Sequence, residues 1–306
     1  MAERKAIVDV GTNSVKFCLA EGDGHGSFKV IKDTNDIARL GEGLKDSGCI
    51  GTEALERNAR SVAAFVEEAR SAGAEDIRIV GTMALRTARN AEAFIARVKE
   101  LCGLAPRVLS GEEEAQLSYV AVLSGIDGAS RADLVTMDTG GGSTEFVFGR
   151  AGKITKKFSL NVGAVRFTED YLSQMPVPAE KLAAARTAIK KELGEGGVAG
   201  PVKFLVGMGG TVTSMAAVKH KMTVYDPAVI QGSVLTLDDV RSQIADYASK
   251  TLEQRREIVG LQPKRADVIL AGACIVEAVM ELMAADGLTV SDRSLRHGLL
   301  YNLFKA

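Results

Sequence analysis

The stretch VTMDTGGGSTEFVFG, residues 135–149, places three consecutive glycines between two runs of apolar and β-branched residues. The runs are typical of strands, and the glycines of the turn that joins them. Glycine accepts positive φ and lets bare N–H groups approach a ligand, so successive turn amides can surround phosphate oxygens. Asp138, just before the turn, is placed to bind a metal ion or its water. An ordinary tight turn is the alternative explanation.

Two further glycine turns, at residues 9–14 and 207–211, have the same character. DVGTNS ends one strand-like run as MDTGGGS ends another, so Asp9 and Asp138 stand at matching positions. GMGGT at 207–211 opens a helix, whose N-terminus favours negative charge. Three such turns together are explained better by phosphate binding than by three unrelated tight turns.

The order of elements repeats along the chain. Strands followed by alternating helices and strands fill the first third, and a second set of strands begins at residue 133. This order predicts an α/β protein with two related domains that face each other across a cleft.

Composition excludes several classes of protein. The chain has 306 residues, 46% hydrophobic and 25% charged, with a net charge of -1. No apolar run reaches the ~20 residues of a membrane span, and the charge is not that of a general nucleic-acid binder. The N-terminus lacks an export signal, so we expect a cytoplasmic protein. Four scattered cysteines without a CxxC pair, and three distant histidines, favour neither a zinc site nor disulfides.

One glutamate in LSGEEEAQLSYVAV, residues 109–122, has no structural explanation. Ser110 and Glu113 form a capping box, and Glu112 lies in the first helical turn, where the helix dipole favours it. Glu114 remains, on a stripe of small residues. A carboxylate there could take a proton from water that attacks phosphorus, although a solvated glutamate is the common alternative.

Basic residues supply the opposite charge. Arg86 and Arg89 follow a strand directly, where ligands of α/β proteins gather, and arginine suits phosphate. Four more basic pairs could form a track for a long polyanion, with a solvated surface as the favoured alternative: Lys156 and Lys157, Lys219 and Lys221, Lys264 and Arg265, Arg293 and Arg296. His220 and His297 show no partner in the sequence, so we assign them no role.

These motifs resemble those of a known family. The glycine turns look like the phosphate loops of the actin, sugar kinase and Hsp70 superfamily. With ARLGEGLKDSGCI, GTMALRTARN, SGEEEAQLSYVAV, NVGAVRFTEDYL, KRADVILAG and SDRSLRHGLLY, their order resembles the exopolyphosphatase and guanosine pentaphosphate phosphohydrolase (Ppx/GppA) family, in its short two-domain form. The resemblance implies two actin-like (ribonuclease H-like) α/β domains around a phosphate-binding cleft, over 1–125 and 126–306. A C-terminal helix of about 294–306 would pack back onto the first.

The resemblance also implies roles for individual residues. Glu114 would be the catalytic base, Asp138 would position metal or water, and Glu145 would be a further acidic residue. Arg86 falls on the phosphate-binding arginine. Asp9 and Asp138 would hold Mg²⁺ or Mn²⁺. The remaining phosphate contacts would come from the three turns: Gly11, Thr12, Asn13, Ser14, Gly140, Gly141, Gly142, Ser143, Gly209, Gly210 and Thr211. Thr12 stands where family members often have serine, and it keeps the hydroxyl.

The resulting functional hypothesis is an exopolyphosphatase that hydrolyses the terminal phosphoanhydride of inorganic polyphosphate and releases orthophosphate. Hydrolysis of guanosine pentaphosphate is the alternative. An ATP-dependent kinase fits the glycine turns but leaves SGEEEA and ALRTARN unexplained, and a non-catalytic sensor would not need Glu114. The expected partners are polyphosphate or guanosine pentaphosphate, with neither nucleic acid nor a membrane, and the superfamily allows a homodimer.

Overall fold

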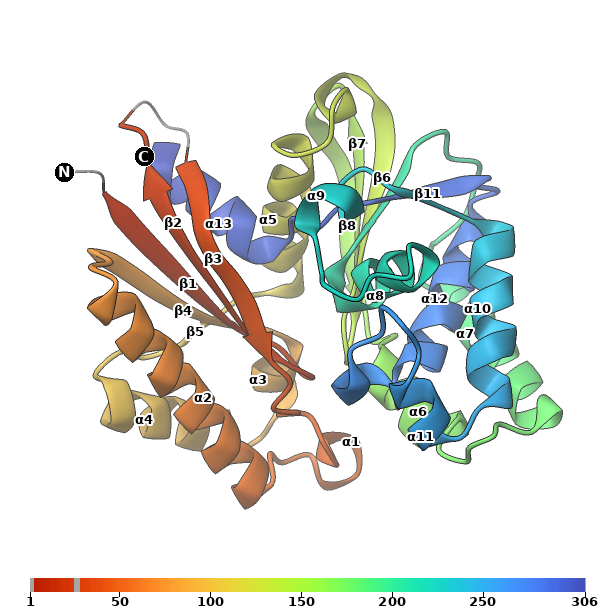
Figure 1. Cartoon of the computed structure of the whole chain (residues 1–306), viewed down its shortest axis with the longest axis horizontal. Helices are drawn as coiled ribbons and strands as arrows, with labels where there is room; N and C mark the ends of the chain where they lie inside the picture. The colour runs from red at the N-terminus through yellow and green to blue at the C-terminus, as the bar shows by residue number, and fades with distance from the viewer. Residues whose placement is uncertain (1–2, 25–27, 306) are drawn as a thin grey trace. The chain divides into compact units, whose positions relative to one another are not determined.

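The structure is a computed structural model that describes residues 3–24 and 28–305. The chain divides into two compact units (Figure 1). Unit 1 consists of residues up to Ala121 together with the segment from Leu295 onward, and unit 2 is the continuous stretch Val122–Ser294. Unit 1 is therefore assembled from both ends of the chain.

Unit 1 contains a five-stranded sheet in the order β3-β2-β1-β4-β5. The antiparallel part precedes the parallel part in sequence: a tight turn joins β1 to β2, β3 pairs antiparallel with β2, and helices precede the parallel strands β4 and β5. The strands are β1 (Arg4–Val10), β2 (Val15–Gly22), β3 (Phe28–Asp36), β4 (Asp76–Gly81) and β5 (Arg107–Val108).

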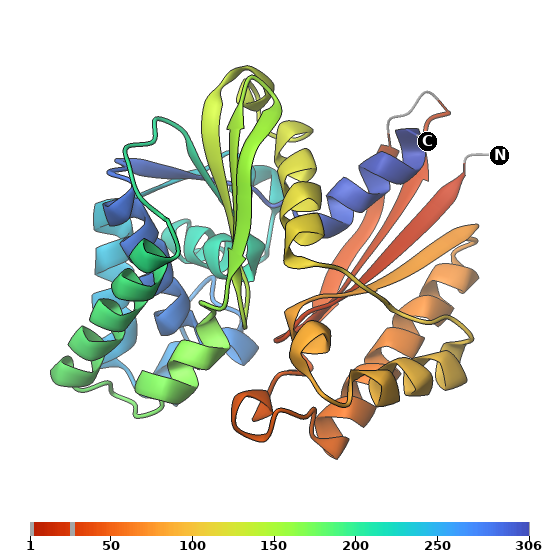
Figure 2. The same ribbon diagram turned by 180° about the vertical axis from the view of Figure 1, so that it is seen from behind.

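Helices cover both faces of this sheet, since successive strand side chains point to opposite faces. On one face, residues such as Phe17 pack with α2 (Thr52–Ser71) and α4 (Ala91–Cys102). On the other, residues such as Cys18 pack with α5 (Gly111–Leu123) and α13 (Leu295–Lys305), which lie side by side in Figure 2. Two short helices, α1 (Leu44–Ser47) and α3 (Met83–Thr87), follow β3 and β4.

Unit 2 contains a six-stranded sheet in the order β10-β11-β9-β6-β7-β8. Without β10, this is the order and the pairing direction of unit 1, so the repeat expected from the sequence is present. The strands are β6 (Asp133–Thr139), β7 (Thr144–Arg150), β8 (Lys153–Leu160), β9 (Leu205–Met208), β10 (Val234–Thr236) and β11 (Gly287–Val290). The predicted α/β class is confirmed.

The core of unit 2 surrounds α12 (Ile269–Leu282), which is apolar on nearly all sides and buried along most of its length. Its one buried carboxylate, Glu277, pairs with Arg186 and Arg241 from the two neighbouring helices. The other helices are α6 (Ala164–Tyr171), α7 (Ala179–Glu195), α8 (Gly209–Lys219), α9 (Pro227–Ile230), α10 (Leu237–Ser249) and α11 (Leu252–Arg256), with 3-10 turns at Ala129–Arg131 and Pro263–Arg265. Among the described residues, no helix is long and apolar enough to cross a bilayer.

Candidate active site

The first glycine turn joins β1 to β2 in unit 1. Gly11 donates its amide to the Ser14 carbonyl across 3.0 Å, which closes the hairpin. Asp9 pairs with Lys16 across the two strands, and Lys16 Nζ lies 3.4 Å from Asp9 Oδ2. Asp9 is only 2% exposed, and its Oδ1 is buried without a hydrogen-bond partner. A buried, unsatisfied carboxylate oxygen costs free energy unless a cation or water meets it.

The segment that follows β3 forms backbone hydrogen bonds to this turn. Arg39 and Gly41 donate their amides to the carbonyls of Asn13 and Thr12, across 3.0 and 2.9 Å. Arg39 adopts a positive φ of 52°, an uncommon conformation for a residue with a side chain. The carbonyl groups of the turn are therefore already bonded to protein, and the turn residues Thr12 and Asn13 are buried.

Glu114 lies in the first turn of α5 and is bound by the predicted arginine. Arg86 Nη1, at the end of α3, lies 2.7 Å from Glu114 Oε2 and also donates to the Leu109 carbonyl across 3.0 Å. The two side chains are 20% and 12% exposed, so the pair is shielded from solvent. Nη1 makes both contacts, which leaves Nε and Nη2 of the same guanidinium without a hydrogen bond to the described residues.

The capping box expected at the start of α5 is confirmed. Glu113 accepts the Ser110 amide across 2.9 Å and donates its own amide to Ser110 Oγ across 3.1 Å. The Ser110 amide holds the pKa of Glu113 below its ordinary value. With Glu113 engaged in the cap, Glu114 is the glutamate of this run that pairs with Arg86.

The second glycine turn joins β6 to β7 in unit 2 and has the same closing hydrogen bond. Gly140 donates to the Ser143 carbonyl across 2.9 Å. Here Asp138 pairs across the strands with Glu145, and both carboxylates are buried, at 8% and 3% exposure. Ser159 Oγ donates to Glu145 across 2.7 Å. Like charges directly opposite each other in a sheet are destabilising, so this pair favours a bound cation.

Helix α6 supports the second turn from behind. Ala164 and Val165 donate their amides to the carbonyls of Gly140 and Gly141, across 3.0 and 2.8 Å. A Cβ on Gly163 would lie 2.4 Å from both the Gly141 oxygen and the Gly142 carbonyl carbon. Two backbone segments meet here without room for side chains, which gives these glycines a packing role that the sequence argument did not include.

The third glycine turn joins β9 to α8 and lies against the second. Gly209 has a φ of +87°, and a Cβ there would lie 2.5 Å from Asp138 Oδ1. The side chain of Thr211 packs on Gly272 of α12, where a Cβ would lie 2.5 Å from its methyl group. Unit 2 therefore brings Asp138 to the backbone of the helix N-terminus that was predicted to favour negative charge.

Arg265 was expected at a solvated surface, and that interpretation is wrong. It is 9% exposed, and a Cβ on Gly210 would lie 2.3 Å from its Nη1, so its guanidinium lies on the third turn. The sequence signal for it is weak, because Arg265 belongs to a separate 3-10 turn far along the chain. Lys16 was also not singled out, although its register with Asp9 follows from the hairpin.

Four of the other basic residues named from the sequence have partners outside these turns. Arg89 donates to the Ser47 carbonyl, Lys219 to Asp239, and Arg293 to the Ser124 carbonyl. Arg296 pairs with Asp33 through two hydrogen bonds, and His297, for which no partner was expected, lies 3.1 Å from the same carboxylate. Lys219 and Arg296 are thus paired with carboxylates, whereas Arg89 and Arg293 bind backbone carbonyls and keep their charge.

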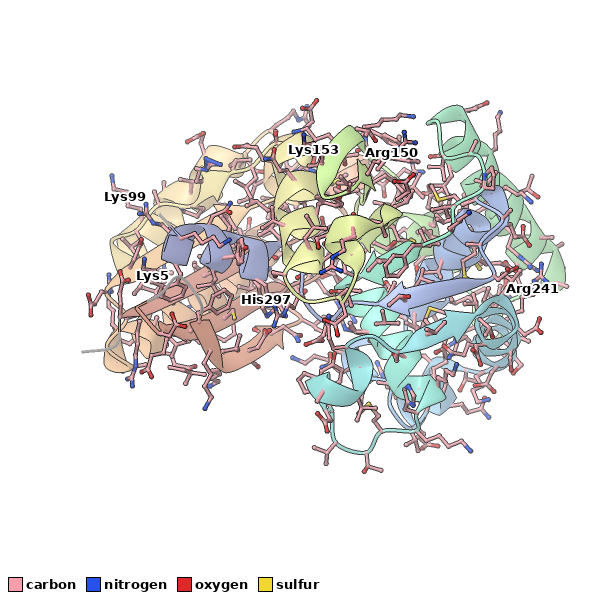
Figure 3. The ribbon with its side chains drawn as sticks, turned by 90° about the horizontal axis from the view of Figure 1, so that it is seen from above. Lys5, Lys99, Arg150, Lys153, Arg241 and His297 are labelled. Atoms are coloured by element: carbon pink, nitrogen blue, oxygen red, sulfur yellow. The ribbon has the colours of Figure 1, made fainter. Side chains whose placement is uncertain are left out.

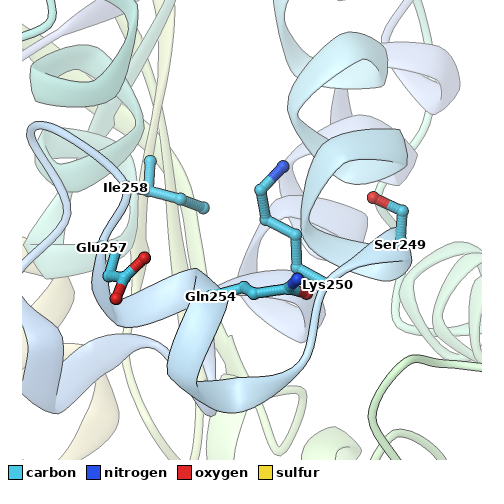
Figure 4. Close-up of a pocket in the computed structure, with 5 residues that line it drawn as sticks. All are labelled: Ser249, Lys250, Gln254, Glu257 and Ile258. Carbon is cyan, nitrogen blue, oxygen red and sulfur yellow. The ribbon is translucent and has the colours of Figure 1, made fainter.

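A hollow of about 470 Å³ lies at the end of α10 and the start of α11 in unit 2 (Figure 4). Its lining residues are Ser249, Lys250, Gln254, Glu257 and Ile258. None of them belongs to a glycine turn, and Lys250 is paired with Asp246. The hollow is therefore separate from the candidate catalytic groups of this unit.

The residues present fit the divalent metal that the family resemblance implies. The buried Asp9 Oδ1 lacks a hydrogen-bond partner, and Asp138 and Glu145 place two carboxylates on neighbouring strands. A donor set made only of oxygens suits Mg²⁺ or Mn²⁺ rather than a metal that prefers sulfur.

Comparison with known proteins gives consistent results. The Ppx/GppA phosphatase family matches residues 19–306. Exopolyphosphatase 2 of Mycobacterium tuberculosis is 31% identical over 98% of this chain and 98% of its own. A crystal structure of the Aquifex aeolicus member of the Ppx/GppA family is 32% identical, with a TM-score of 0.83 over 99% of this chain and 98% of that chain. An exopolyphosphatase-like protein superposes with a TM-score of 0.91 at 28% identity, over 99% and 98%.

The match extends over almost the whole chain, and the related structures share the α/β fold described above. The resemblance inferred from the motifs is thereby confirmed. The chain belongs to the Ppx/GppA phosphatase family.

Proposed function

We propose that this family member is an exopolyphosphatase, which removes the terminal phosphate of inorganic polyphosphate as orthophosphate. Family membership makes it a hydrolase of phosphoanhydrides. The observation that carries the assignment of a base is the pair of Glu114 and Arg86, at 2.7 Å and shielded from solvent. Hydrolysis needs a group that accepts a proton from water. A kinase needs a base for its acceptor hydroxyl as well, so the family match is what favours hydrolysis over phosphate transfer.

Glu114 is the proposed general base that removes a proton from the attacking water. Arg86 holds the carboxylate through Nη1, and the other nitrogens of its guanidinium are available to a phosphate oxygen. The ion pair thus links the position of the base to the position of the phosphorus that water attacks, and such positioning accounts for much of the rate in phosphoryl transfer.

The turn amides are the proposed phosphate ligands. In unit 2 the carbonyls of Gly140 and Gly141 are bonded to α6, and the Gly140 N–H closes the turn on Ser143, so the N–H groups that follow Gly140 are the ones proposed to bind an anion. The start of α8 and the guanidinium of Arg265 on Gly210 add positive potential. In unit 1 the turn Gly11, Thr12, Asn13 and Ser14 has the same construction. Their role is to neutralise charge on the terminal phosphate and the leaving oxygen.

Asp9, Asp138 and Glu145 are the proposed ligands of Mg²⁺ or Mn²⁺, directly or through water. When bound, the ion would compensate phosphate charge and lower the barrier to departure of the leaving group. Without it, these buried carboxylates would oppose an approaching phosphate.

Guanosine pentaphosphate is the second candidate substrate, since it also ends in a phosphoanhydride and the family name covers both activities.

A cytoplasmic location is part of the proposal, because the described cysteines form no disulfide, as is usual in a reducing compartment. A homodimer remains an expectation of the superfamily.

The test is orthophosphate release in parallel from long-chain polyphosphate, guanosine pentaphosphate and ATP, with Mg²⁺ and with chelator. The wild type is compared with Glu114→Gln and with Glu112→Gln, an exposed neighbour on the same helix. We expect release from polyphosphate to be lost in Glu114→Gln while binding of polyphosphate is kept, and both to be normal in Glu112→Gln.

Other results of this assay would indicate a different function. Preference for the guanosine nucleotide would replace exopolyphosphatase by pentaphosphate hydrolase. Transfer from ATP to a small acceptor would identify a kinase. Polyphosphate binding without turnover would identify a sensor, and normal turnover in Glu114→Gln would reject the base.

A further inference from the structure

Three metal-binding side chains meet on the face of the unit 1 sheet that α5 and α13 cover. Cys18 Sγ, an Asp33 carboxylate oxygen and a His297 ring nitrogen all lie within 4.8 Å of one another. Cys18 is fully buried and His297 is 4% exposed. Figure 3 shows His297 at the N-terminal end of α13, beside the strands. None of the three belongs to the catalytic groups proposed above.

The cluster is held by regular elements. Cys18 on β2 and Asp33 on β3 are direct cross-strand partners, so their side chains leave the same face of the sheet. His297 lies in the first turn of α13, which packs on this face through Leu295 and Leu300. Two strands and one helix therefore fix the three donors.

Arg296 fixes the orientation of the carboxylate. Its Nε and Nη2 lie 2.8 and 2.9 Å from the two oxygens of Asp33, and His297 Nε2 lies 3.1 Å from Oδ2. Burial alone would raise the pKa of Asp33, but Arg296 and His297 together hold it well below its ordinary value. These contacts orient the carboxylate. Oδ1 keeps a second lone pair for another ligand, and Oδ2, which accepts from both Arg296 and His297, would regain one when His297 binds a metal instead.

We propose that Cys18, Asp33 and His297 form a second metal site, selective for a zinc-like divalent cation. Thiolate and imidazole donors prefer Zn²⁺ to Mg²⁺, which prefers oxygen ligands. Zinc bonds of about 2.0–2.3 Å in a tetrahedral site place neighbouring ligand atoms about 3.3–3.8 Å apart. The donors therefore need to move together by only about 1 Å.

Binding follows a simple proton balance. The Cys18 thiol loses its proton to become the thiolate ligand, and His297 binds through Nε2 as neutral imidazole, with its proton on Nδ1. The hydrogen bond between Nε2 and Asp33 Oδ2 is replaced by two bonds to the metal, while Arg296 keeps its own contacts. The ion would join β2, β3 and α13, and so attach the last helix to the first hairpin of the chain.

The test uses the full chain, stripped of metal under reducing conditions, and titrated with Co²⁺ as a spectroscopic substitute for Zn²⁺. We expect one equivalent with a sulfur-to-cobalt charge-transfer band in the near ultraviolet. Zinc should displace it, an excess of Mg²⁺ should not, and zinc should raise the melting temperature of the wild type. Absence of this band in the wild type would overturn the proposal.

Matched variants locate the site. Cys18→Ser should lose the band, whereas Cys49→Ser, which removes a thiol outside the cluster, should keep it. His297→Gln keeps every cysteine, and we expect its cobalt affinity to fall by about 10-fold or more. A band retained in Cys18→Ser, or wild-type affinity in His297→Gln, would overturn the proposal. Circular dichroism checks that each variant is folded. If Cys18→Ser does not fold, the cobalt affinity of His297→Gln is the deciding measurement.

Discussion

The glycine turn at residues 9–14 in unit 1 and the glycine turn at residues 138–143 in unit 2 have the same backbone construction. They differ in the charge of the residue that faces the aspartate. In both, an aspartate ends the first strand, a glycine amide bonds to a serine carbonyl, and a following segment bonds to the turn carbonyls. The residue across from the aspartate differs: Lys16 faces Asp9, whereas Glu145 faces Asp138. One aspartate thus faces a cation of the protein, and the other faces a second carboxylate. We therefore expect the proposed metal chemistry to depend more on unit 2 than on unit 1.

The largest expected difference is catalytic. Asp138→Asn should lower kcat/KM for phosphate release on the order of 10²–10³, because it removes one of two paired carboxylates. Asp9→Asn should lower it only about 10-fold, since Lys16 already compensates this charge. Rates measured over a range of Mg²⁺ concentrations test this, with Asp133→Asn on the exposed end of β6 as control. Equal losses in both variants would remove the distinction between the turns.

The second largest expected difference is in stability, between alanine variants of the two glycines that pack against the turns, Gly163 and Gly41. Gly163→Ala brings Cβ against the backbone of Gly141 and Gly142, and should cost about 1–3 kcal/mol of unfolding free energy as well as activity. Gly41→Ala brings Cβ to 2.2 Å from the Thr12 methyl group, a side chain that can move.

Gly41→Ala should therefore be milder, and the double variant with Thr12→Ser should be restored to wild-type stability, because serine lacks that methyl. Denaturant unfolding of the four proteins measures the effect. Failure of the restoration would show that the backbone of the first turn, and not the methyl, limits the space.

Reversing the charge of Lys16 should make the stability of the unit 1 hairpin depend on a divalent cation, as is proposed for unit 2. Lys16→Glu places two carboxylates opposite each other, and should lower stability by about 1–3 kcal/mol in chelator. Added Mg²⁺ should recover part of this loss. Lys16→Gln is the control, since it removes the ammonium without adding a carboxylate. Identical melting temperatures of the two variants, with and without Mg²⁺, would contradict the cation argument.

The smallest effect concerns the helices that follow the turns. Helix α5 has a capping box, whereas α8 begins at Gly209 and its N-cap residue, Met208, makes no side-chain cap. Ser110→Ala should cost about 1 kcal/mol. Because the pKa of Glu113 is lowered, its contribution to stability is complete above its ordinary value of 4.5 and is lost as the pH falls below it.

Glu113→Gln should therefore show a shallower loss of stability between pH 5 and pH 3, and the difference should be smaller than the effect of Ser110→Ala because solvent screens the half-exposed Glu113. Thermal melts across this range measure it, with Glu112→Gln as control. A wild-type profile for Glu113→Gln would show that the cap does not depend on charge.

Local signals predicted much of this molecule. Each hairpin consists of two strands with a glycine turn between them, so the matching positions of Asp9 and Asp138 follow from the sequence alone. The capping box of α5 is equally local, with partners three residues apart. The fold class followed from the repeated order of such elements.

Contacts between distant elements were not predictable in this way. Arg265 reaches Gly210 from a separate 3-10 turn, and its hydrophilic neighbours in sequence indicated a surface. Arg296 and Asp33 are 263 residues apart, so neither the ion pair nor the neighbouring His297 is visible as a motif. The packing of Gly163 on the second turn depends on where α6 begins. In each case tertiary packing decides the environment of the side chain.

The return of α13 to unit 1 has a consequence for synthesis. Lys5 Nζ donates to the Leu303 carbonyl across 2.7 Å, a contact between residues 298 positions apart. The ribosome releases the chain from the N-terminus, at about 5–20 residues per second. The whole of unit 2 is therefore synthesised before the eleven residues of α13 exist. The apolar face formed by Ile7, Cys18 and Ala20 stays partly uncovered until then, so the unit that is made first is the last to be completed.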